Sequence, residues 1–194
     1  MNKNEDRTRE KIVLSALALF SERGINKTSV NEVAYHAGVT RVTVYRYFSE
    51  KKELVHEVYL RVEQVFQKGL ADLEQAPEAD WESVLNQIGE GLSALPSGDV
   101  FARFDELKRL YPDIYGSIQE IRVATLTGIF EHLFAVTERQ GALRPGLNRS
   151  IVQAIFWELV VNFFDNPRFK SFGLSGAELY RAMLDILLHG IVKS

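Results

Sequence analysis

The chain has 194 residues, of which 46% are hydrophobic, and a formal net charge of −3. This is enough for one large or two small globular domains, and the absence of cysteine excludes a disulfide framework and a thiolate metal site. The polar N-terminus has no apolar signal core, and no run approaches the ~20 apolar residues of a membrane-spanning helix. We therefore expect a soluble, cytoplasmic protein with no membrane partner.

The charge is unevenly distributed along the chain. Residues 1–56 carry ten Lys and Arg against seven Asp and Glu, whereas the remainder carries thirteen against nineteen. This asymmetry favours a polyanion-facing surface at the N-terminal end.

The first predicted helix runs from about residue 7 to residue 23, after an arm of residues 1–6. Gly24 lies just past the last periodic residue and is suited to a left-handed C-terminal turn. The apolar stripe of the helix, at i, i+3, i+4 and i+7, consists of Val13, Ala16, Leu17 and Phe20.

Two short helices follow. Residues 29–32 form a capping box in which Ser29 caps the Glu32 amide while Glu32 reaches back, and this second helix stops at Gly38. Thr40 is suited to cap a third helix that ends at Phe48. Two short helices with this connection are typical of a helix-turn-helix.

The third predicted helix has an unusual outward face. If Val44 and Phe48 point inward, the opposite side carries an arginine, a valine and hydroxyl groups where a solvated helix more often carries Glu, Lys and Gln. Arginine can bind guanine O6 and N7, and an apolar side chain can contact a thymine methyl. Thr and Tyr hydroxyls, Lys ammonium groups and helix N-terminal amides suit phosphate oxygens. The outward set is Val42, Thr43, Tyr45 and Arg46, with Arg41 at the N-terminal end and Tyr47 beside it.

Residues 8–54 resemble the DNA-binding domain of TetR-family transcriptional regulators. The resemblance is carried by FSERGINKTSV, NEVAYHAGV and TRVTVYRYFSEKKELV in this order. It covers about a quarter of the chain, and the remainder is similar only in its length and helical pattern. The resemblance implies an N-terminal three-helix DNA-binding domain, residues 1–48, and a C-terminal helical domain for ligand binding and dimerisation, residues 49–194.

The resemblance also implies roles for individual residues. Tyr45 and Tyr47 match positions that commonly touch DNA, as does Thr43, and Lys51 matches a phosphate-binding lysine. Arg41, Val42 and Arg46 occupy variable positions that set operator preference. The alternative for each arginine is a solvated charge, and Tyr47 can instead pack on a neighbouring helix. The predicted DNA-binding residues are Thr28, Asn31, Thr40, Arg41, Val42, Thr43, Tyr45, Arg46, Tyr47 and Lys51.

The rest of the chain predicts an all-α fold of about nine helices. A long helix capped by Ser49 is predicted to about residue 74, and further helices follow at about 80–95, after Asp99, and at 112–140, 150–165 and 175–193. The helix at 150–165 is apolar on nearly all sides, so it needs to be buried on more than one face. We expect a homodimer through the helices at about 150–165 and 175–193. The alternative is a single deep core within one subunit.

No catalytic, metal or cofactor site is predicted, because the four histidines lie far apart and no catalytic motif occurs. Many aromatic residues lie between the fourth and eighth predicted helices, and such residues either line a pocket or form plain core. Glu158 and Asn162 interrupt a nearly apolar helix, and a buried polar group needs a partner. The candidate ligand-binding residues are Phe66, Phe101, Arg103, Phe104, Tyr111, Arg122, Trp157, Glu158 and Asn162.

The motif and the resemblance together predict a regulator that binds a double-stranded DNA operator as a homodimer. The resemblance implies a repressor that a small, largely apolar effector releases from DNA. One alternative is a DNA-binding protein of the same fold that a protein partner controls. The other is an all-helical enzyme or carrier.

Overall fold

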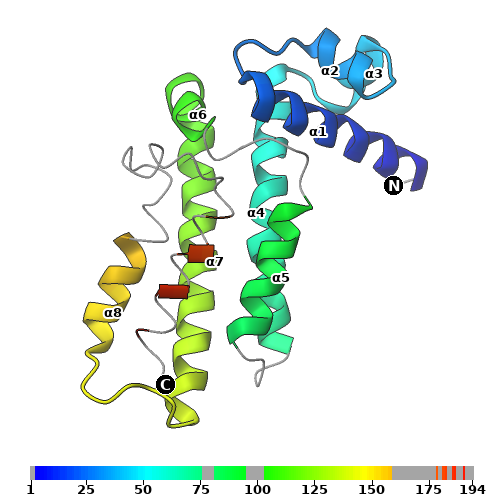
Figure 1. The fold of residues 1–194 in the computed structure, drawn as a ribbon. Coiled ribbons are helices and arrows are strands. Elements are labelled where there is room, and N and C mark those ends of the chain that lie inside the picture. The colour runs from blue at the N-terminus through cyan, green and yellow to red at the C-terminus, as the bar shows by residue number, and fades with distance from the viewer. Residues whose placement is uncertain are drawn as a thin grey trace. The chain divides into compact units, whose positions relative to one another are not determined.

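The structure is a computed structural model that describes residues 3–75, 81–94 and 103–158, together with positions 178, 181–182, 185–186 and 190. Over these residues it contains eight helices, and the predicted all-α fold class is confirmed (Figure 1). Most of the predicted last helix, and the predicted caps Asp80 and Asp99, lie outside the described residues. The helices are α1 (Lys3–Arg23), α2 (Val30–His36), α3 (Arg41–Tyr47), α4 (Lys51–Gln75), α5 (Trp81–Ser93), α6 (Phe104–Leu110), α7 (Pro112–Arg139) and α8 (Arg149–Phe156).

Helix α1 begins earlier than its apolar stripe indicates. It starts at Lys3, so most of the predicted N-terminal arm is helical, and its first turn contains Glu5 and Asp6. Acidic side chains there interact favourably with the positive end of the helix dipole, which explains why the helix extends past the apolar pattern. At its other end Gly24 has a φ of +93°, as predicted for the turn.

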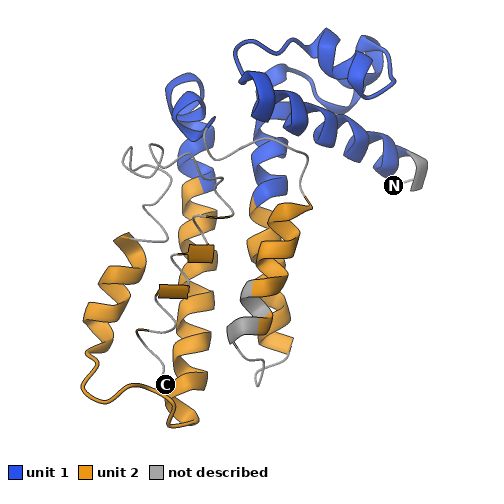
Figure 2. Cartoon of the chain, viewed as in Figure 1, with its two compact units in different colours: residues 1–62, 95–118 blue, residues 63–94, 119–194 orange. Residues whose placement is uncertain are grey.

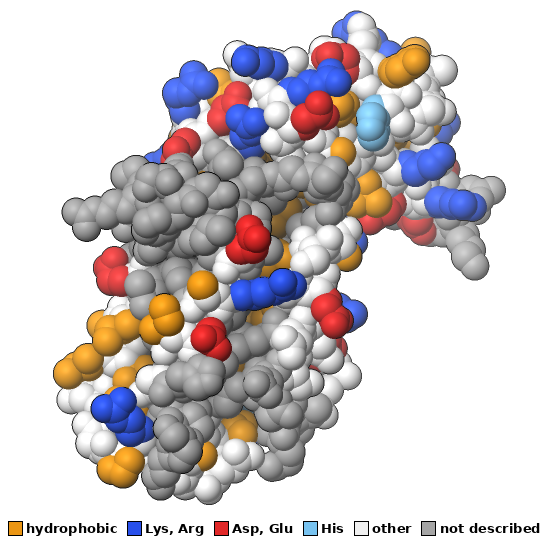
Figure 3. Space-filling model, viewed as in Figure 1, with side chains coloured by type: hydrophobic (Ala, Val, Ile, Leu, Met, Phe, Trp, Pro, Cys, Tyr) orange, Lys and Arg blue, Asp and Glu red, His pale blue; other side chains and the backbone are white. Residues whose placement is uncertain are grey.

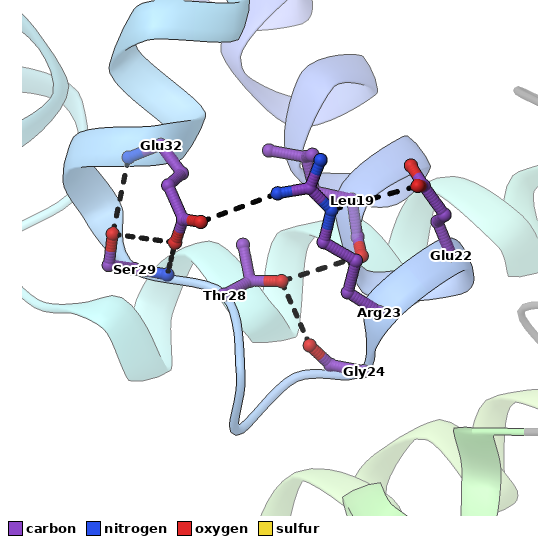
Figure 4. A network of polar contacts seen from close by, with 7 residues as sticks. All are labelled: Leu19, Glu22, Arg23, Gly24, Thr28, Ser29 and Glu32. Carbon is purple, nitrogen blue, oxygen red and sulfur yellow. Dashed lines mark hydrogen bonds and ion pairs between the residues drawn. The ribbon is translucent and has the colours of Figure 1, made fainter.

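The connection from α2 to α3 forms as the local motifs predict. The Ser29 hydroxyl accepts the Glu32 N–H at 3.2 Å, and the Ser29 N–H donates to Glu32 Oε2 at 2.7 Å, which completes the capping box (Figure 4). Gly38 has a φ of +66°. Thr40 caps α3 by accepting the Thr43 N–H at 3.1 Å.

The N-terminal end of α4 differs from the prediction in detail. The helix begins at Lys51, two positions after the predicted cap Ser49. The N–H and the hydroxyl of Ser49 both donate to Glu53 Oε2, at 2.6 and 2.9 Å. Ser49 therefore anchors the first turn through an acidic side chain inside the helix.

The chain divides into two compact units (Figure 2). One consists of residues 1–62 and 95–118, and the other of residues 63–94 and 119–194. Helices α4 and α7 each contribute residues to both units. The first unit thus contains the helix-turn-helix, the first half of α4, the whole of α6 and the start of α7. It extends past residue 48, which the sequence predicts as the end of the DNA-binding domain.

The core of the first unit joins helices that are distant in sequence. The buried ring of Tyr59 on α4 meets Phe104 on α6 edge-on, with centroids 5.0 Å apart. The Phe104 ring also meets Tyr115 on α7 edge-on, with centroids 6.5 Å apart. The predicted inward residues Val44 and Phe48 are both 1% exposed.

In the second unit the helices α4 and α5 approach closely through glycines. A Cβ atom at Gly69 on α4 would lie 2.7 Å from Ile88 Cγ1 on α5, and one at Gly91 on α5 would lie 2.7 Å from Val65 Cγ1 on α4. These distances are too short for any larger residue without movement. The two glycines therefore set how closely α4 and α5 pack.

Among the described residues, helix α8 buries Val152 and Phe156 on one face. Asn148 caps its N-terminus by accepting the Ser150 N–H at 2.9 Å. Its buried residue Phe156 stacks at 4.8 Å on Phe130 of α7, whereas Ile151 and Ile155 are 59% and 44% exposed. Figure 3 shows hydrophobic side chains at the surface over this helix.

Candidate nucleic-acid interface

The outward face of α3 presents the side chains that the sequence predicts. Val42 is 79% exposed, an unusual position for a bare valine, and Arg41 and Arg46 are exposed beside it. In the view of Figure 3, Lys and Arg side chains gather on the surface of the first unit. The buried residue Val44 fixes the opposite side of the helix to the core. The face is therefore held rigidly and combines hydrogen-bond donors with one apolar contact.

Each arginine of this face packs against a tyrosine of the same helix. The Arg41 Cζ atom lies 5.3 Å from the centroid of the Tyr45 ring, and Nη2 donates to the Tyr45 hydroxyl at 3.4 Å. The Arg46 Cζ atom lies 5.1 Å from the centroid of the Tyr47 ring, and Nη2 donates to the Tyr47 hydroxyl at 3.4 Å. Tyr45 is 39% exposed and Tyr47 is half-buried. Both guanidinium groups are thus held by cation–π contacts.

The threonines of α3 are arranged around its N-terminus. The hydroxyl oxygens of Thr40 and Thr43 lie 2.9 Å apart, and that of Thr40 also accepts the Thr43 N–H. Thr40 is exposed and Thr43 is half-buried. Asn31 is exposed in the first turn of α2. These hydroxyl and amide groups lie at the N-terminal ends of two helices, where the helix dipole favours phosphate.

Thr28 is placed differently from the other predicted contacts. Its side chain is 1% exposed, and its hydroxyl donates to the Gly24 carbonyl at 2.9 Å, with the Leu19 carbonyl at 3.4 Å (Figure 4). The hydroxyl therefore satisfies carbonyl groups at the end of α1 and does not face solvent. We remove Thr28 from the candidate DNA contacts.

Lys51 has a second role besides the predicted one. Its Nζ donates to the Ile25 carbonyl at 2.6 Å, and the side chain is half-buried. Burial lowers the pKa of the Lys51 ammonium group, while the carboxylates of Glu106 and Glu32 act in the opposite direction. An ammonium group has three N–H donors, so this bond is compatible with a phosphate contact, which remains a prediction.

The turn after α1 is also held by α6, an arrangement that the sequence analysis missed. Glu106 accepts the N–H groups of Ile25 and Asn26 at 2.9 and 3.0 Å. Arg103, a candidate ligand residue, instead donates to the carbonyls at the end of α1: Nε to Ser21 at 3.2 Å and Nη2 to Glu22 at 2.9 Å. About 80 positions separate these partners in sequence, so no local pattern indicates the contact.

The other candidate ligand residues that the structure describes are divided between the two units. Phe104 and Tyr111 belong to the first unit, whereas Phe66 and Arg122 belong to the second. Phe66 and Phe104 are each 1% exposed and form core. Phe101 and Asn162 lie outside the described residues. Trp157 is half-buried.

Glu158, which the sequence predicts to be a buried polar group, is at the surface of the single chain. Its side chain is exposed and lies in a surface groove of about 580 Å³ along α8. The groove walls include the exposed residues Ile151 and Ile155. A partner for this carboxylate on a ligand or a second subunit stays a prediction.

Arg122 forms a buried ion pair that the sequence did not indicate. Its side chain is 0% exposed and that of Glu63 is 1% exposed. The guanidinium contacts both carboxylate oxygens, with Arg122 Nε 3.3 Å from Glu63 Oε2. Burial raises the pKa of the Glu63 carboxyl group, against the opposing effect of the Arg122 charge. The third guanidinium nitrogen, Arg122 Nη1, donates to Gln119 Oε1.

Within the described part of the chain, no group of three or more His, Asp and Glu side chains is arranged to hold a metal ion. None of the described helices combines the length and the apolar character that crossing a bilayer requires.

Comparison with known proteins adds a family. Residues 12–58, which include α2 and α3, match the model for bacterial regulatory proteins of the tetR family. The chain is 35% identical over 85 residues to the HTH-type transcriptional regulator AcrR of Shigella flexneri, a match that covers 42% of this chain but only 38% of AcrR. Sequence likeness to this relative is thus confined to less than half of either protein.

Solved structures extend the likeness in fold to nearly the whole chain. A structure from Mesorhizobium loti MAFF303099 assigned to the same family has a TM-score of 0.67 at 23% identity and covers 99% of this chain and 100% of its own. SmeT, the repressor of a multidrug efflux pump of Stenotrophomonas maltophilia, has a TM-score of 0.56 at 21% identity, over 99% of this chain and 94% of SmeT. SmeT is also known in complex with triclosan. The match to the tetR-family model thus covers the helix-turn-helix region, and the solved structures show a shared fold over nearly the whole chain.

Proposed function

We propose that the protein is a sequence-specific transcriptional repressor that binds a double-stranded DNA operator as a homodimer and is released by a small, largely apolar effector. The observation that carries the proposal is the outward face of α3, where two exposed arginines and an exposed valine stand on a helix fixed by a buried valine. It acts by binding, in the cytoplasm, and not as an enzyme.

The side chains of this face divide into two proposed roles. Arg41 and Arg46 read guanine edges in the major groove, and Val42 contacts a thymine methyl. The polar groups bind phosphate oxygens and so set the register on the duplex. The proposed phosphate contacts are Asn31, Thr40, Thr43, Tyr45, Tyr47 and Lys51.

Dimerisation is proposed through the exposed side of α8 and the segment that follows it. Ile151 and Ile155 give this helix an apolar outer face beside its packed inner face. Two copies of such a face are self-complementary, as an isologous interface requires. A dimer places two recognition helices in successive major grooves when they are roughly 34 to 36 Å apart.

The proposed effector rests on analogy with a protein of similar fold and on the thermodynamic coupling between effector binding and DNA binding. SmeT, similar in fold, binds triclosan, and AcrR is similar over the DNA-binding region. An effector releases DNA only to the extent that it binds better to the state with low DNA affinity.

The proposal is tested in two steps. The wild-type protein first selects bound duplexes from a random pool, and the enriched duplex is then titrated with protein in the presence of triclosan or other apolar probes. We expect one enriched palindromic sequence and weaker binding with at least one probe. Enrichment without release by any probe favours control by a protein partner, whereas the absence of any enrichment contradicts the DNA-binding function.

The assignment of the α3 face is tested with matched arginine variants. Arg46→Ala and Arg41→Ala are each expected to cost about 1 to 3 kcal/mol of specific binding. Arg139→Ala is the control, because Arg139 is exposed at the end of α7, outside the helix-turn-helix. Equal operator affinity in all three variants would show that DNA binds elsewhere.

A further inference from the structure

The two arginine–tyrosine pairs of α3 differ in how they form. Arg41 and Tyr45 are four residues apart, so they lie on the same side of the helix. Arg46 and Tyr47 are adjacent, and neighbouring residues on a helix do not normally face each other, so helical spacing alone does not predict this contact. Despite this difference, both guanidinium groups lie over a ring and donate to its hydroxyl.

This arrangement matters because an exposed arginine is normally mobile. Its long side chain loses rotamer freedom when it is fixed against a base, and that loss weakens binding. A ring that already holds the guanidinium reduces the loss. The tyrosine hydroxyl takes one N–H of Nη2, so the other N–H groups of the guanidinium stay available for guanine O6 and N7.

We propose that Tyr45 and Tyr47 are positioning residues that hold Arg41 and Arg46 in the orientation for reading guanine. This inference rests on the proposed function and adds to it. The tyrosine rings contribute to sequence preference, whereas the tyrosine hydroxyl groups bind phosphate. Each tyrosine hydroxyl accepts one arginine N–H and keeps its own O–H for a phosphate oxygen.

The positions of the two arginines also bear on the kind of operator. Arg41 and Arg46 are five residues apart, which corresponds to about 7.5 Å along the helix axis and about 140° around it. The two side chains therefore leave α3 in different directions and address different base pairs. Each half-site is expected to contain guanines at two positions, with a thymine methyl near Val42.

Phenylalanine and leucine variants separate the ring from the hydroxyl. Tyr45→Phe and Tyr47→Phe keep the ring and lose the phosphate bond, whereas Tyr45→Leu and Tyr47→Leu lose both. The experiment measures the affinity of each variant for the selected operator and for operators in which one guanine is replaced by adenine. Far-UV circular dichroism and thermal unfolding verify that each variant is folded.

The phenylalanine variants are expected to bind both operators more weakly while the guanine preference stays within about twofold of the wild type. The leucine variants are expected to lose about two- to fivefold of the guanine preference at the position read by the paired arginine, the ratio that corresponds to an exposed cation–π contact. Combining Arg46→Ala with Tyr47→Leu should then cause no further loss of that preference, since the ring acts through the arginine.

Two results overturn the inference while leaving the proposed function intact. One is an unchanged guanine preference in folded leucine variants, and the other is an equal loss in the phenylalanine and leucine variants. Failure of the proposed function looks different: the wild type then shows no preferred operator at all. Tyr47 is half-buried, so Tyr47→Leu can fail to fold. In that case the comparison of Tyr45→Phe with Tyr45→Leu, at the more exposed tyrosine, is decisive.

Discussion

Replacing Arg122 by methionine tests the importance of the buried ion pair in the second unit. The variant leaves Glu63, which is 1% exposed, without its charge partner. Breaking a buried pair from one side typically costs about 3 to 5 kcal/mol. The carboxyl group can also escape by binding a proton, and this sets an upper limit to the cost.

This upper limit to the destabilisation by Arg122→Met depends on pH. The ordinary pKa of the Glu63 carboxyl group is 4.5, so keeping it protonated costs ~4 kcal/mol at about pH 7.5 and ~1.4 kcal/mol at about pH 5.5. In the folded wild type, burial already raises this pKa. The folded state therefore binds more protons than the unfolded state just above the ordinary pKa, and stability falls as the pH rises through this window. Removing Arg122 raises the pKa of the Glu63 carboxyl group further, so stability continues to fall up to a higher pH.

Urea unfolding followed by far-UV circular dichroism, at one fixed protein concentration, measures the effect. Arg122→Met is expected to lose about 3 to 4 kcal/mol near neutral pH and much less near about pH 5.5. The double variant with Glu63→Leu should recover most of the loss. As the control, Arg61→Met breaks the exposed pair with Glu10 and should cost at most about 1 kcal/mol. A loss for Arg122→Met that is below 1 kcal/mol or independent of pH refutes the reasoning.

Three further predictions concern other parts of the chain. Glu106→Ala leaves the buried Ile25 amide without its acceptor and should destabilise the protein by about 1 to 3 kcal/mol in thermal or urea unfolding; Glu106→Gln, which retains an acceptor, should cost less, and equal costs would contradict this account. Ser29→Ala removes the cap of α2 and should cost about 1 kcal/mol in the same assay, a prediction that fails if stability is unchanged. Ile155→Glu is expected to convert the dimer into a monomer in sedimentation, whereas Glu158→Gln in the same groove should remain dimeric; a monomeric wild type would rule out the proposed interface.

The parts of the fold that depend on neighbouring residues could be predicted from sequence. The capping box needs only a serine and a glutamate three positions apart, and Ser29 and Glu32 form it as expected. Gly24 and Gly38 both have positive φ values at the predicted helix ends. In each case the physics acts within one turn of the chain, so the pattern carries the information.

The parts that depend on distant residues could not be predicted. Thr28 beside a capping serine resembles an exposed polar residue, and only the packing of the turn shows that its hydroxyl is buried. The sequence predicts Arg122 as a ligand-binding candidate, and no local pattern indicates its partner Glu63, which lies 59 positions earlier. The same holds for Arg103, whose acceptors are the carbonyl groups at the end of α1.

The central claim is that the exposed face of α3 chooses the DNA sequence. Its most direct test is to select duplexes from one random pool with the wild type and, in parallel, with the double variant Arg41→Ala/Arg46→Ala, whose helical content is checked first. We predict that the wild type enriches a palindrome with guanines at two positions of each half-site, and that the folded double variant loses this enrichment. The same sequence enriched by both proteins would contradict the claim.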